Sequence, residues 1–406
     1  MVRATASSAA NRLPIGLSDF ERLRESGMAY ADKTDFVCRL AACPYRTFFL
    51  ARPCGFGKTL LASTFASLFS KGTQFFQGLK AEVLWQERVR YRVLRLDFSR
   101  LVDFADRGDL EDKFKNYLSE ALGDAGLESP DPTMGSVALM WRRALKLPEP
   151  IVLIVDDCDA PIAVHLFEPE KLLAAKTVMN DFFLGVKAGA GNLRFAFLTG
   201  TFQLRQLSIF AGFNNGEDIS LDPSFAVIAG STEAELRTAF GPWLRRAAEL
   251  NGVSVEALLR DLRIMYRGYA FDEAGTGQVY ATKSVLQFLE KPELGLRPCR
   301  QLSGVEMSVL SKALQAIGQG RAVAPADFEV DQAVPVSALM GADAQFNGIA
   351  LLTQAGILTI KSIRGNTAYV GLPNEEARMA LAALCAQEGQ ASQRDGMEGM
   401  TAAARL

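Results

Sequence analysis

The sequence predicts an α/β fold in which a parallel sheet is covered by helices on both faces. Four apolar segments are typical of buried strands: residues 47–51, 92–98, 151–155 and 193–200. Segments with helical patterns separate them, for example 110–122 and 169–187. Such an alternation of strands and helices favours a parallel sheet with right-handed crossover connections.

The first strand leads into a loop that is typical of phosphate binding. Thr47-Phe-Phe-Leu-Ala-Arg-Pro-Cys-Gly-Phe-Gly-Lys-Thr59 reads as a strand, a tight turn and the start of a helix. Backbone N–H groups near Gly55 to Thr59 would surround nucleotide phosphates at the positive end of this helix. Lys58 would neutralise the β and γ phosphates, and the Thr59 hydroxyl would bind Mg²⁺. The expected nucleotide contacts are Arg52, Gly55, Phe56, Gly57, Lys58, Thr59 and Leu60.

Arg52 departs from the usual loop pattern, G-x-x-x-x-G-K-[ST], which has glycine at this position. Taken alone, the segment therefore fits a plain strand–turn–helix equally well. A second element about a hundred residues later favours the phosphate-binding interpretation.

That second element is an apolar strand followed by carboxylates. Ile151-Val-Leu-Ile-Val155 fits a central parallel strand, and Asp156 and Asp157 follow it directly. Two carboxylates are costly to bury unless they face a cation or a crevice, and the crevice of an α/β sheet lies beyond the carboxyl ends of its strands. We therefore expect Asp156 to bind Mg²⁺ and Asp157 to polarise the attacking water. The alternative is a polar turn in which Asp159 caps the next helix.

The other two strands place further polar groups at the same edge. Residues 92–98 lie between the two motifs in the sequence. The strand over 47–51 corresponds to the P-loop strand of P-loop NTPases, and the strand over 151–155 to their Walker B strand. A further strand between these two is typical of the P-loop NTPases that keep an acidic base beside the magnesium aspartate. Thr199, at the end of the strand over 193–200, is expected to sense the γ-phosphate.

These motifs belong to a longer series that resembles one known family. The series comprises Leu13–Phe20, Tyr30–Thr34, Arg52–Pro53, Phe56–Leu60, Leu96–Ser99, Asp159–Ile162, Phe197–Gly200, Ser208–Asn215, Gly268–Phe271 and Leu372–Glu376. In this order it resembles the AAA-ATPase-like proteins of bacteria and archaea, over about residues 12–385. The resemblance implies a P-loop ATPase and accounts for Arg52. Many members carry a PD-(D/E)XK-type nuclease in the C-terminal half.

The chain departs from this family around the phosphate site. The family has two basic residues where Cys54 and Gly55 stand, and Glu where Asp157 stands. It has a cation two residues after Thr-Gly, whereas Arg205 is the nearest cation here, expected to assist catalysis with Lys58, Asp157 and Thr199. These differences favour slow hydrolysis over loss of nucleotide binding. The nuclease pattern expected after residue 376 is absent from the sequence.

The chain is expected to divide into five parts: a flexible leader over 1–12, a P-loop ATPase domain over 13–230, a helical lid over 231–300, a winged-helix-like domain over 301–385 and a disordered tail over 386–406. A capping box, Thr232 with Glu235, opens a lid helix that reaches Leu250, and Ser254 starts another. Lid arginines include a candidate arginine finger.

The winged-helix expectation rests on a helix over 344–354 followed by strands over 357–363 and 368–372. The helix segment 346–354 lacks Lys and Arg, which favours packing or protein binding over DNA reading.

The composition of the chain bears on which kinds of binding site and which cellular location to expect. The net charge of −2 does not indicate a general nucleic-acid surface, and six cysteines without a C-x-x-C pair indicate neither zinc nor a disulfide framework. The sequence shows no membrane span or signal peptide, which favours the cytoplasm, and the single His165 is expected to be structural.

The resulting hypothesis is a slow ATPase that uses ATP and Mg²⁺ to switch a protein partner or its own association. Two alternatives stay open: an interaction module with little or no hydrolysis that acts with a separately encoded nuclease, and a degenerate relic of a nuclease-fused ancestor.

Overall fold

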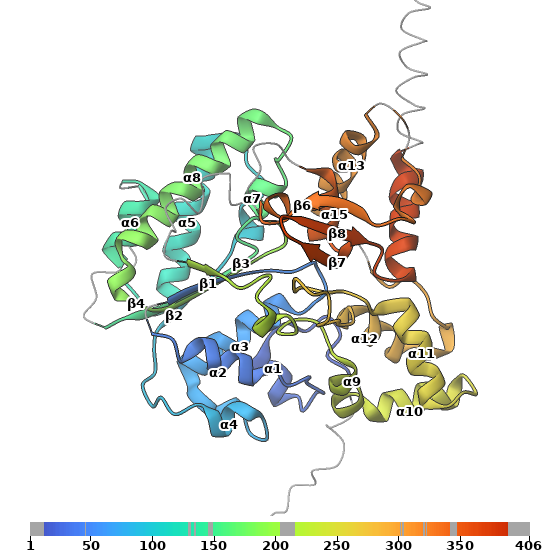
Figure 1. The fold of residues 1–406 in the computed structure, drawn as a ribbon. Helices are drawn as coiled ribbons and strands as arrows, with labels where there is room; N and C mark the ends of the chain where they lie inside the picture. Colours follow the sequence, from blue (N-terminus) through green and yellow to red (C-terminus); the bar gives the residue numbers. More distant parts are fainter. Residues whose placement is uncertain are drawn as a thin grey trace, which may run out of the picture.

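The computed structural model describes residues 12–44, 46–128, 131–133, 135–144, 149–203, 216–300, 302, 304–319, 321, 323–341 and 347–388 of the 406-residue chain. The fold is an α/β sheet with helices on both faces, followed by a helical unit and a smaller antiparallel sheet (Figure 1).

The main sheet has five parallel strands in the order β2-β3-β4-β1-β5. Their bounds are β1 Arg46–Ala51, β2 Val93–Asp97, β3 Ile151–Asp156, β4 Leu193–Gly200 and β5 Gly216–Asp218. All four predicted strands are present. The strand between the P-loop strand and the Walker B strand is β4, whereas β2, which the sequence order suggested for this place, lies at the edge. Asp97 pairs with Asp156 and Ala51 with Gly200, so the motif ends share one edge.

Two helical layers cover this sheet because its strands are apolar on both faces. The layer on one face comprises α1 Phe20–Glu25, α2 Thr34–Ala41, α3 Lys58–Lys71 and α4 Lys80–Leu84. The layer on the other face comprises α5 Arg107–Asp124, α6 Val137–Ala144, α7 Ala160–Ala163 and α8 Pro169–Ala188. Along β3, Leu153 and Val155 pack into the second layer and Val152 and Ile154 into the first, as the two-residue period of a strand requires.

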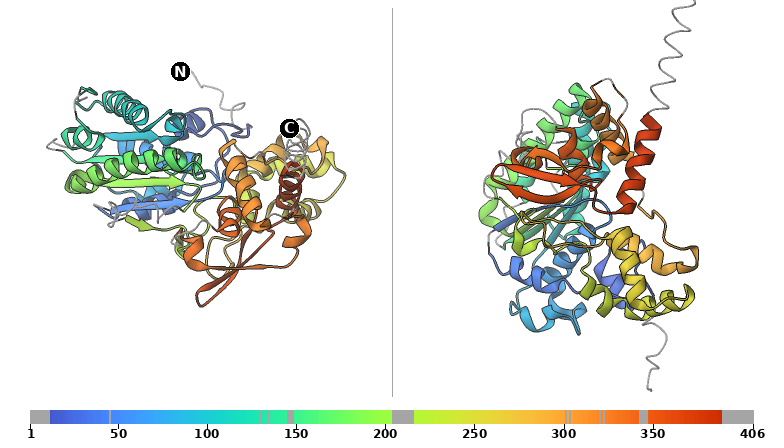
Figure 2. Two further views of the ribbon diagram at one scale, coloured as in Figure 1. Left: turned by 90° about the horizontal axis from the view of Figure 1, so that it is seen from above. Right: turned by 45° about the vertical axis from the view of Figure 1, so that its right-hand side comes forward.

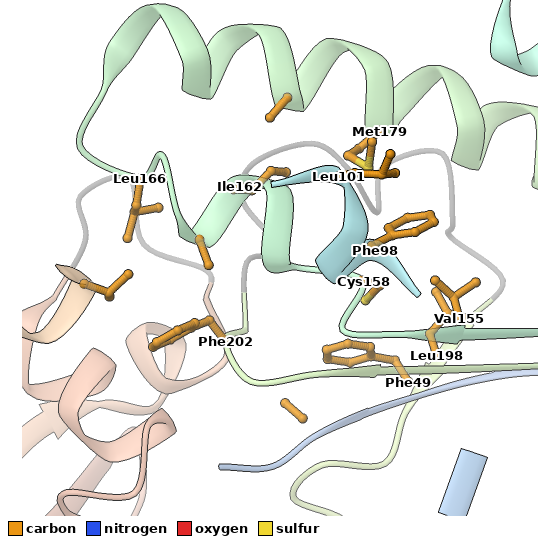
Figure 3. Packing of buried hydrophobic residues seen from close by; sticks show 14 of the residues in the cluster. Phe49, Phe98, Leu101, Val155, Cys158, Ile162, Leu166, Met179, Leu198 and Phe202 are labelled. Carbon is orange, nitrogen blue, oxygen red and sulfur yellow. The ribbon is translucent and has the colours of Figure 1, made fainter. Parts of the chain in front are cut away.

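The core of the second layer is rich in aromatic rings. Phe98 directly follows β2, and its ring lies 5.6 Å from that of Phe182 on α8. Figure 3 shows Phe98, Leu101 and Met179 gathered between β3 and α8. This packing fixes the carboxyl end of β3 against α8 and so positions the acidic residues that follow β3.

The segment predicted to be a lid, residues 231–300, contains four helices around a core of its own: α9 Glu233–Ala239, α10 Gly241–Leu250, α11 Val255–Tyr266 and α12 Thr282–Glu290. It is called the lid below for brevity, and its role as a lid stays a prediction. The predicted capping box is confirmed, and Ser254 caps α11. The single helix predicted up to Leu250 is wrong, because the chain breaks at Phe240 between α9 and α10. Pro242 explains the break, since it has no N–H to continue the hydrogen bonds of α9.

The C-terminal module contains α13 Gly304–Gly318, β6 Gln332–Pro335, α14 Val336–Leu339, α15 Gly348–Gln354, β7 Thr359–Arg364 and β8 Thr367–Gly371, with antiparallel strand order β6-β8-β7. α15 begins at Gly348 because Asn347 caps it, and residues 342–346 lie outside the described range. Its apolar residues join the same core as α5 and α8. The predicted boundary at residue 301 and the winged-helix assignment stay predictions.

A further helix over 375–388 packs beside this module (Figure 2), so helical structure continues past the predicted start of the tail at 386. The leader over 1–11 and residues 389–406 lie outside the described range. Among the described residues, the structure contains no helix with the length and apolar character needed to cross a membrane.

Candidate nucleotide-binding site

The loop between β1 and α3 has the backbone geometry that a phosphate-binding loop needs. Gly55 and Gly57 have φ angles of 87° and 93°, in the left-handed region that glycine adopts without strain. α3 begins at Lys58, so its free N–H groups face the loop. The Lys58 Nζ donates to the carbonyl oxygens of Arg52 at 2.9 Å and Pro53 at 3.4 Å, and to the Thr201 hydroxyl at 3.2 Å. The ammonium is therefore held over the loop by neutral acceptors.

Arg52 has a structural position. Its guanidinium donates to the carbonyl oxygens of Ala51 at 2.8 Å, Ser220 at 2.7 Å and Phe225 at 3.2 Å. It also lies 4.1 Å from the centroid of the Phe271 ring. Burial lowers the pKa of Arg52 to about 9. The side chain predicted to contact the nucleotide therefore points away from it, and only the Arg52 carbonyl reaches the site, through Lys58.

Gly230, directly before the lid, and Lys283 of the lid hold the loop from the other side. The Gly230 N–H donates to the Phe56 carbonyl at 2.8 Å, and the Lys283 N–H donates to the Gly55 carbonyl at 3.1 Å. The Phe56 ring is buried edge-to-face against Tyr269, with ring centroids 4.8 Å apart. Phe56 is thus an anchor of the loop, and its predicted contact with the nucleotide could come only from its backbone.

Asp156 is positioned by Thr199. The Thr199 hydroxyl donates to Asp156 Oδ1 and accepts from the Asp157 N–H at 3.2 Å. Thr199 has no exposed surface and does not line the cavity described below. The structure therefore does not support Thr199 as the group that touches the γ-phosphate, because its hydroxyl is engaged by the acidic motif.

Asp157 lines the cavity described below, and both its backbone φ angle and the pKa of its carboxyl group are unusual. Its φ of 46° lies in the left-handed region, which Asp tolerates better than most residues. Burial raises the pKa of Asp157 to about 7, and the neighbouring Asp156, Asp159 and Asp97 add to the effect, whereas Lys58 opposes it. The carboxyl is therefore half protonated near neutral pH unless another cation approaches.

Asp159 occupies the N-cap position of α7, as the alternative expected, but its side chain makes no capping hydrogen bond to that helix. Its carboxylate accepts the Thr201 N–H at 3.1 Å and the Phe202 N–H at 2.7 Å. Burial raises the pKa of Asp159, and these hydrogen bonds and Lys58 oppose the rise. The carboxylate therefore belongs to the loop after β4 and not to the helix that follows β3.

These groups line one cavity of about 530 Å³ between the sheet edge and the lid, within the usual range for ligand sites. Its walls include Cys54–Leu61, Asp157, Thr201 and Ser231. The N-terminal segment 14–18 and residues 282, 283 and 286 of the lid complete the lining. The sequence correctly predicted that Lys58 and Asp157 meet at one site.

The residues present fit Mg²⁺. Mg²⁺ in nucleotide sites keeps several waters and is held by one or two protein oxygens together with phosphate. Thr59 and Asp157 line the cavity, and Asp156 directly precedes Asp157 in the chain without itself lining the cavity. Among the described residues, no group of three or more His, Cys, Asp or Glu is arranged to hold a metal ion.

Two arginines that were candidates for contacting the phosphates are not found at the cavity among the described residues. Arg205 lies outside the described residues. Arg263 is paired with Glu233 at 2.6 Å, and hydrogen bonding from Arg263 lowers the pKa of Glu233 to about 2, which indicates a structural pair. The arginine-finger interpretation has no support at Arg263.

Sequence reasoning missed several polar residues that line the cavity, among them Thr201, Lys283 and Glu306. Lys283 and Glu306 are distant in sequence from the phosphate loop and from the acidic strand end, although Lys283 directly precedes the motif Ser284-Val-Leu286. Lys33 lines it too, and its Nζ donates to the Val227 carbonyl at 2.5 Å and to Glu235 at 2.7 Å. Its place in the Tyr30–Thr34 motif was the available signal.

The sheet order, the glycine loop and the acidic strand end define a P-loop ATPase fold. The family described as predicted AAA-ATPase matches residues 14–210. This match confirms, for residues 14–210, the resemblance to the AAA-ATPase-like family that the motifs indicated.

Comparison with individual proteins gives one relative and weaker structural likenesses. An uncharacterised protein of the vnfD 5′ region of Azotobacter chroococcum mcd 1 is 30% identical over 360 residues, which is 87% of this chain and 65% of that protein. The chain thus spans about two thirds of that relative's length.

Among solved structures, the ORC2 protein of Aeropyrum pernix in ADPNP–ADP complexes is 12% identical, with a TM-score of 0.40 over 89% of this chain and 94% of that one. Drosophila ORC bound to AT-rich DNA and Cdc6 is 15% identical, with a TM-score of 0.29 over 77% and 43%.

Proposed function

We propose that this protein binds ATP with Mg²⁺ in the cavity at the sheet edge, hydrolyses it slowly, and thereby switches a protein partner or its own association. The observation that carries the proposal is the convergence of Lys58, Asp157 and Thr201 in one cavity that the lid also lines. A ligand there would touch both the sheet edge and the lid, so its phosphate state could alter how the two are held.

Each residue at the site has a chemical role in this proposal. The N–H groups at the start of α3 would hold the phosphates, and Lys58 would exchange its carbonyl acceptors for phosphate oxygens. Thr59 and Asp156 would hold Mg²⁺, which supplies charge neutralisation when bound. Asp157 would orient the attacking water and accept its proton.

Two features of Asp157 support slow turnover. Its carboxylate is one C–C bond, roughly 1.5 Å, shorter in reach than the Glu of the family, and misplacement on this scale can cost on the order of a hundredfold in rate. Burial also raises its pKa to about 7, so a fraction of the molecules lacks the charged base at neutral pH. The same features favour the second candidate, a nucleotide-dependent interaction module with little hydrolysis.

Replacing Lys58 by Ala tests nucleotide binding directly. We expect Lys58→Ala to lose binding of Mg-ATP, because the positive charge at the loop would be removed while the fold stays intact. Isothermal titration calorimetry measures the affinity, and circular dichroism checks the fold.

The matched control is Lys113→Ala, which removes an exposed lysine paired with Asp109 at 2.9 Å on α5. Wild-type affinity in a folded Lys58→Ala protein would exclude the phosphate-binding role of this loop.

A further inference from the structure

Two threonines lie at the end of β4, and the cavity is open to only one of them. Thr199 is fully buried, and its hydroxyl is engaged by Asp156 and by the Asp157 N–H. Thr201 lines the cavity, and its Oγ1 lies 3.2 Å from Lys58 Nζ. The hydroxyl that faces the expected phosphate position is therefore that of Thr201.

Asp159 fixes the backbone that carries Thr201. Both of its carboxylate oxygens lie 3.1 Å from the Thr201 nitrogen, and Oδ2 also accepts the Phe202 N–H at 2.7 Å. The approach requires glycine at position 200, because a Cβ there would lie 2.8 Å from Asp159 Oδ1. Both oxygens of the Asp159 carboxylate are thus turned toward the backbone of residues 201 and 202.

The next residue anchors the loop at its other side. Phe202 is 2% exposed and packs into the large core (Figure 3). The Gln203 N–H then donates to the Gln354 side chain of α15 at 3.1 Å. The segment from Thr201 to Gln203 is thus held at three successive residues, which leaves the Thr201 hydroxyl little freedom to leave the cavity.

We propose that Thr201 is the hydroxyl that contacts the γ-phosphate and that Asp159 is the positioning residue that holds Thr201 there. The inference rests on the proposed function. In the nucleotide-free protein the Thr201 hydroxyl accepts from Lys58. When a γ-phosphate engages Lys58, the O–H of Thr201 turns to donate to a phosphate oxygen. ADP lacks that oxygen, so Thr201 contributes to the binding of ATP and not of ADP.

The test compares two ligands on one variant. Thr201→Val keeps the shape of the side chain and removes its O–H donor. A hydrogen bond to a charged group supports a loss of about ten- to hundredfold in the affinity for a non-hydrolysable ATP analogue, whereas the ADP affinity stays within about twofold. Calorimetry with Mg²⁺ measures both dissociation constants. Thr201→Ser should restore the analogue affinity, and Thr238→Val on the exposed face of α9 is the matched control.

Asp159→Asn tests the positioning role. Its amide presents at most one oxygen to the two N–H donors, so the variant should lose discrimination between the analogue and ADP as Thr201→Val does. A merely structural role would lower the melting temperature and both affinities in parallel, or change neither. Asp131→Asn is the control, because exposed Asp131 also accepts a backbone N–H, that of Thr133 at 2.8 Å.

The outcomes distinguish a failure of the roles assigned to Thr201 and Asp159 from a failure of nucleotide binding itself. Unchanged discrimination in a folded Thr201→Val protein overturns the assignment of Thr201, even if Asp159→Asn does not fold. A wild-type protein that binds neither ligand overturns the proposed function itself. Loss of discrimination in Thr201→Val with normal discrimination in a folded Asp159→Asn protein retains Thr201 and refutes the role of Asp159.

Discussion

Replacing Asp157 by Asn should stabilise the nucleotide-free protein at alkaline pH and leave its stability nearly unchanged near pH 4. Asn fits the site because it tolerates the φ of 46° and is uncharged. In the wild-type protein, burial raises the pKa of Asp157 to about 7, while an unfolded chain loses this proton near pH 4. Between these values the folded chain binds more protons than the unfolded chain, so raising the pH lowers the free energy of unfolding.

The size of the effect follows from the two pKa values. A difference of roughly three pH units at 1.36 kcal/mol each gives about 4 kcal/mol as an upper limit. The penalty is absent below about pH 4, grows up to about pH 7 and is constant above it. The Asn variant lacks this penalty throughout. The melting temperature of the variant should therefore exceed that of the wild type by an amount that increases from pH 4 to pH 7.

Thermal unfolding followed by circular dichroism at pH 4, 5, 6, 7 and 8, without nucleotide or metal, measures this difference. Asp103→Asn, which replaces an exposed carboxylate, is the control, and its melting temperature should differ from that of the wild type by the same amount at every pH. A stabilisation by Asp157→Asn that is the same at pH 5 and pH 8, or a destabilisation at pH 8, would refute the burial argument.

The remaining predictions concern rate, metal and core. Asp157→Glu should raise steady-state phosphate release by restoring the longer reach; an unchanged or lower rate would move the base elsewhere. Asp156→Asn should instead weaken Mg²⁺-dependent nucleotide binding, seen as a reduced difference between titrations with Mg²⁺ and with EDTA, and an unchanged difference would remove Asp156 from the metal site. Arg52→Lys should destabilise the protein by about 2–4 kcal/mol, because a compact ammonium cannot place its donors where the planar guanidinium reaches the three buried carbonyls and lies over the Phe271 ring. In thermal unfolding, exposed Arg46→Lys should cost less than about 1 kcal/mol, and equal effects would contradict the structural role of Arg52.

The sequence was sufficient for four of the five strands of the main sheet and for the meeting of Lys58 with Asp157, but not for β5 or for the edge position of β2. Apolar runs of strand length predicted the four strands, and the rule that parallel strands end at one edge then placed both motifs together. A proline at position 242 could also have predicted the break between α9 and α10.

Other features could not be read from local pattern. The burial of Arg52 depends on carbonyl oxygens at residues 220 and 225, about 170 residues away. Choosing between Thr199 and Thr201 required the path of the chain after β4, which is set by the carboxylate of Asp159. These contacts join segments that are far apart in the sequence, so the local pattern of apolar and polar residues does not predict them.

The segment that the family covers does not contain everything that shapes its own phosphate loop. Residues 14–210 include the loop, but the acceptors of the Arg52 guanidinium at 220 and 225 and the donors to the loop at Gly230 and Lys283 all lie beyond residue 210. A fragment cut at residue 210 would leave a buried guanidinium and two loop carbonyls without these partners. The geometry of the loop therefore depends on residues 220–230 and on α12 of the lid, both outside the segment that the family covers.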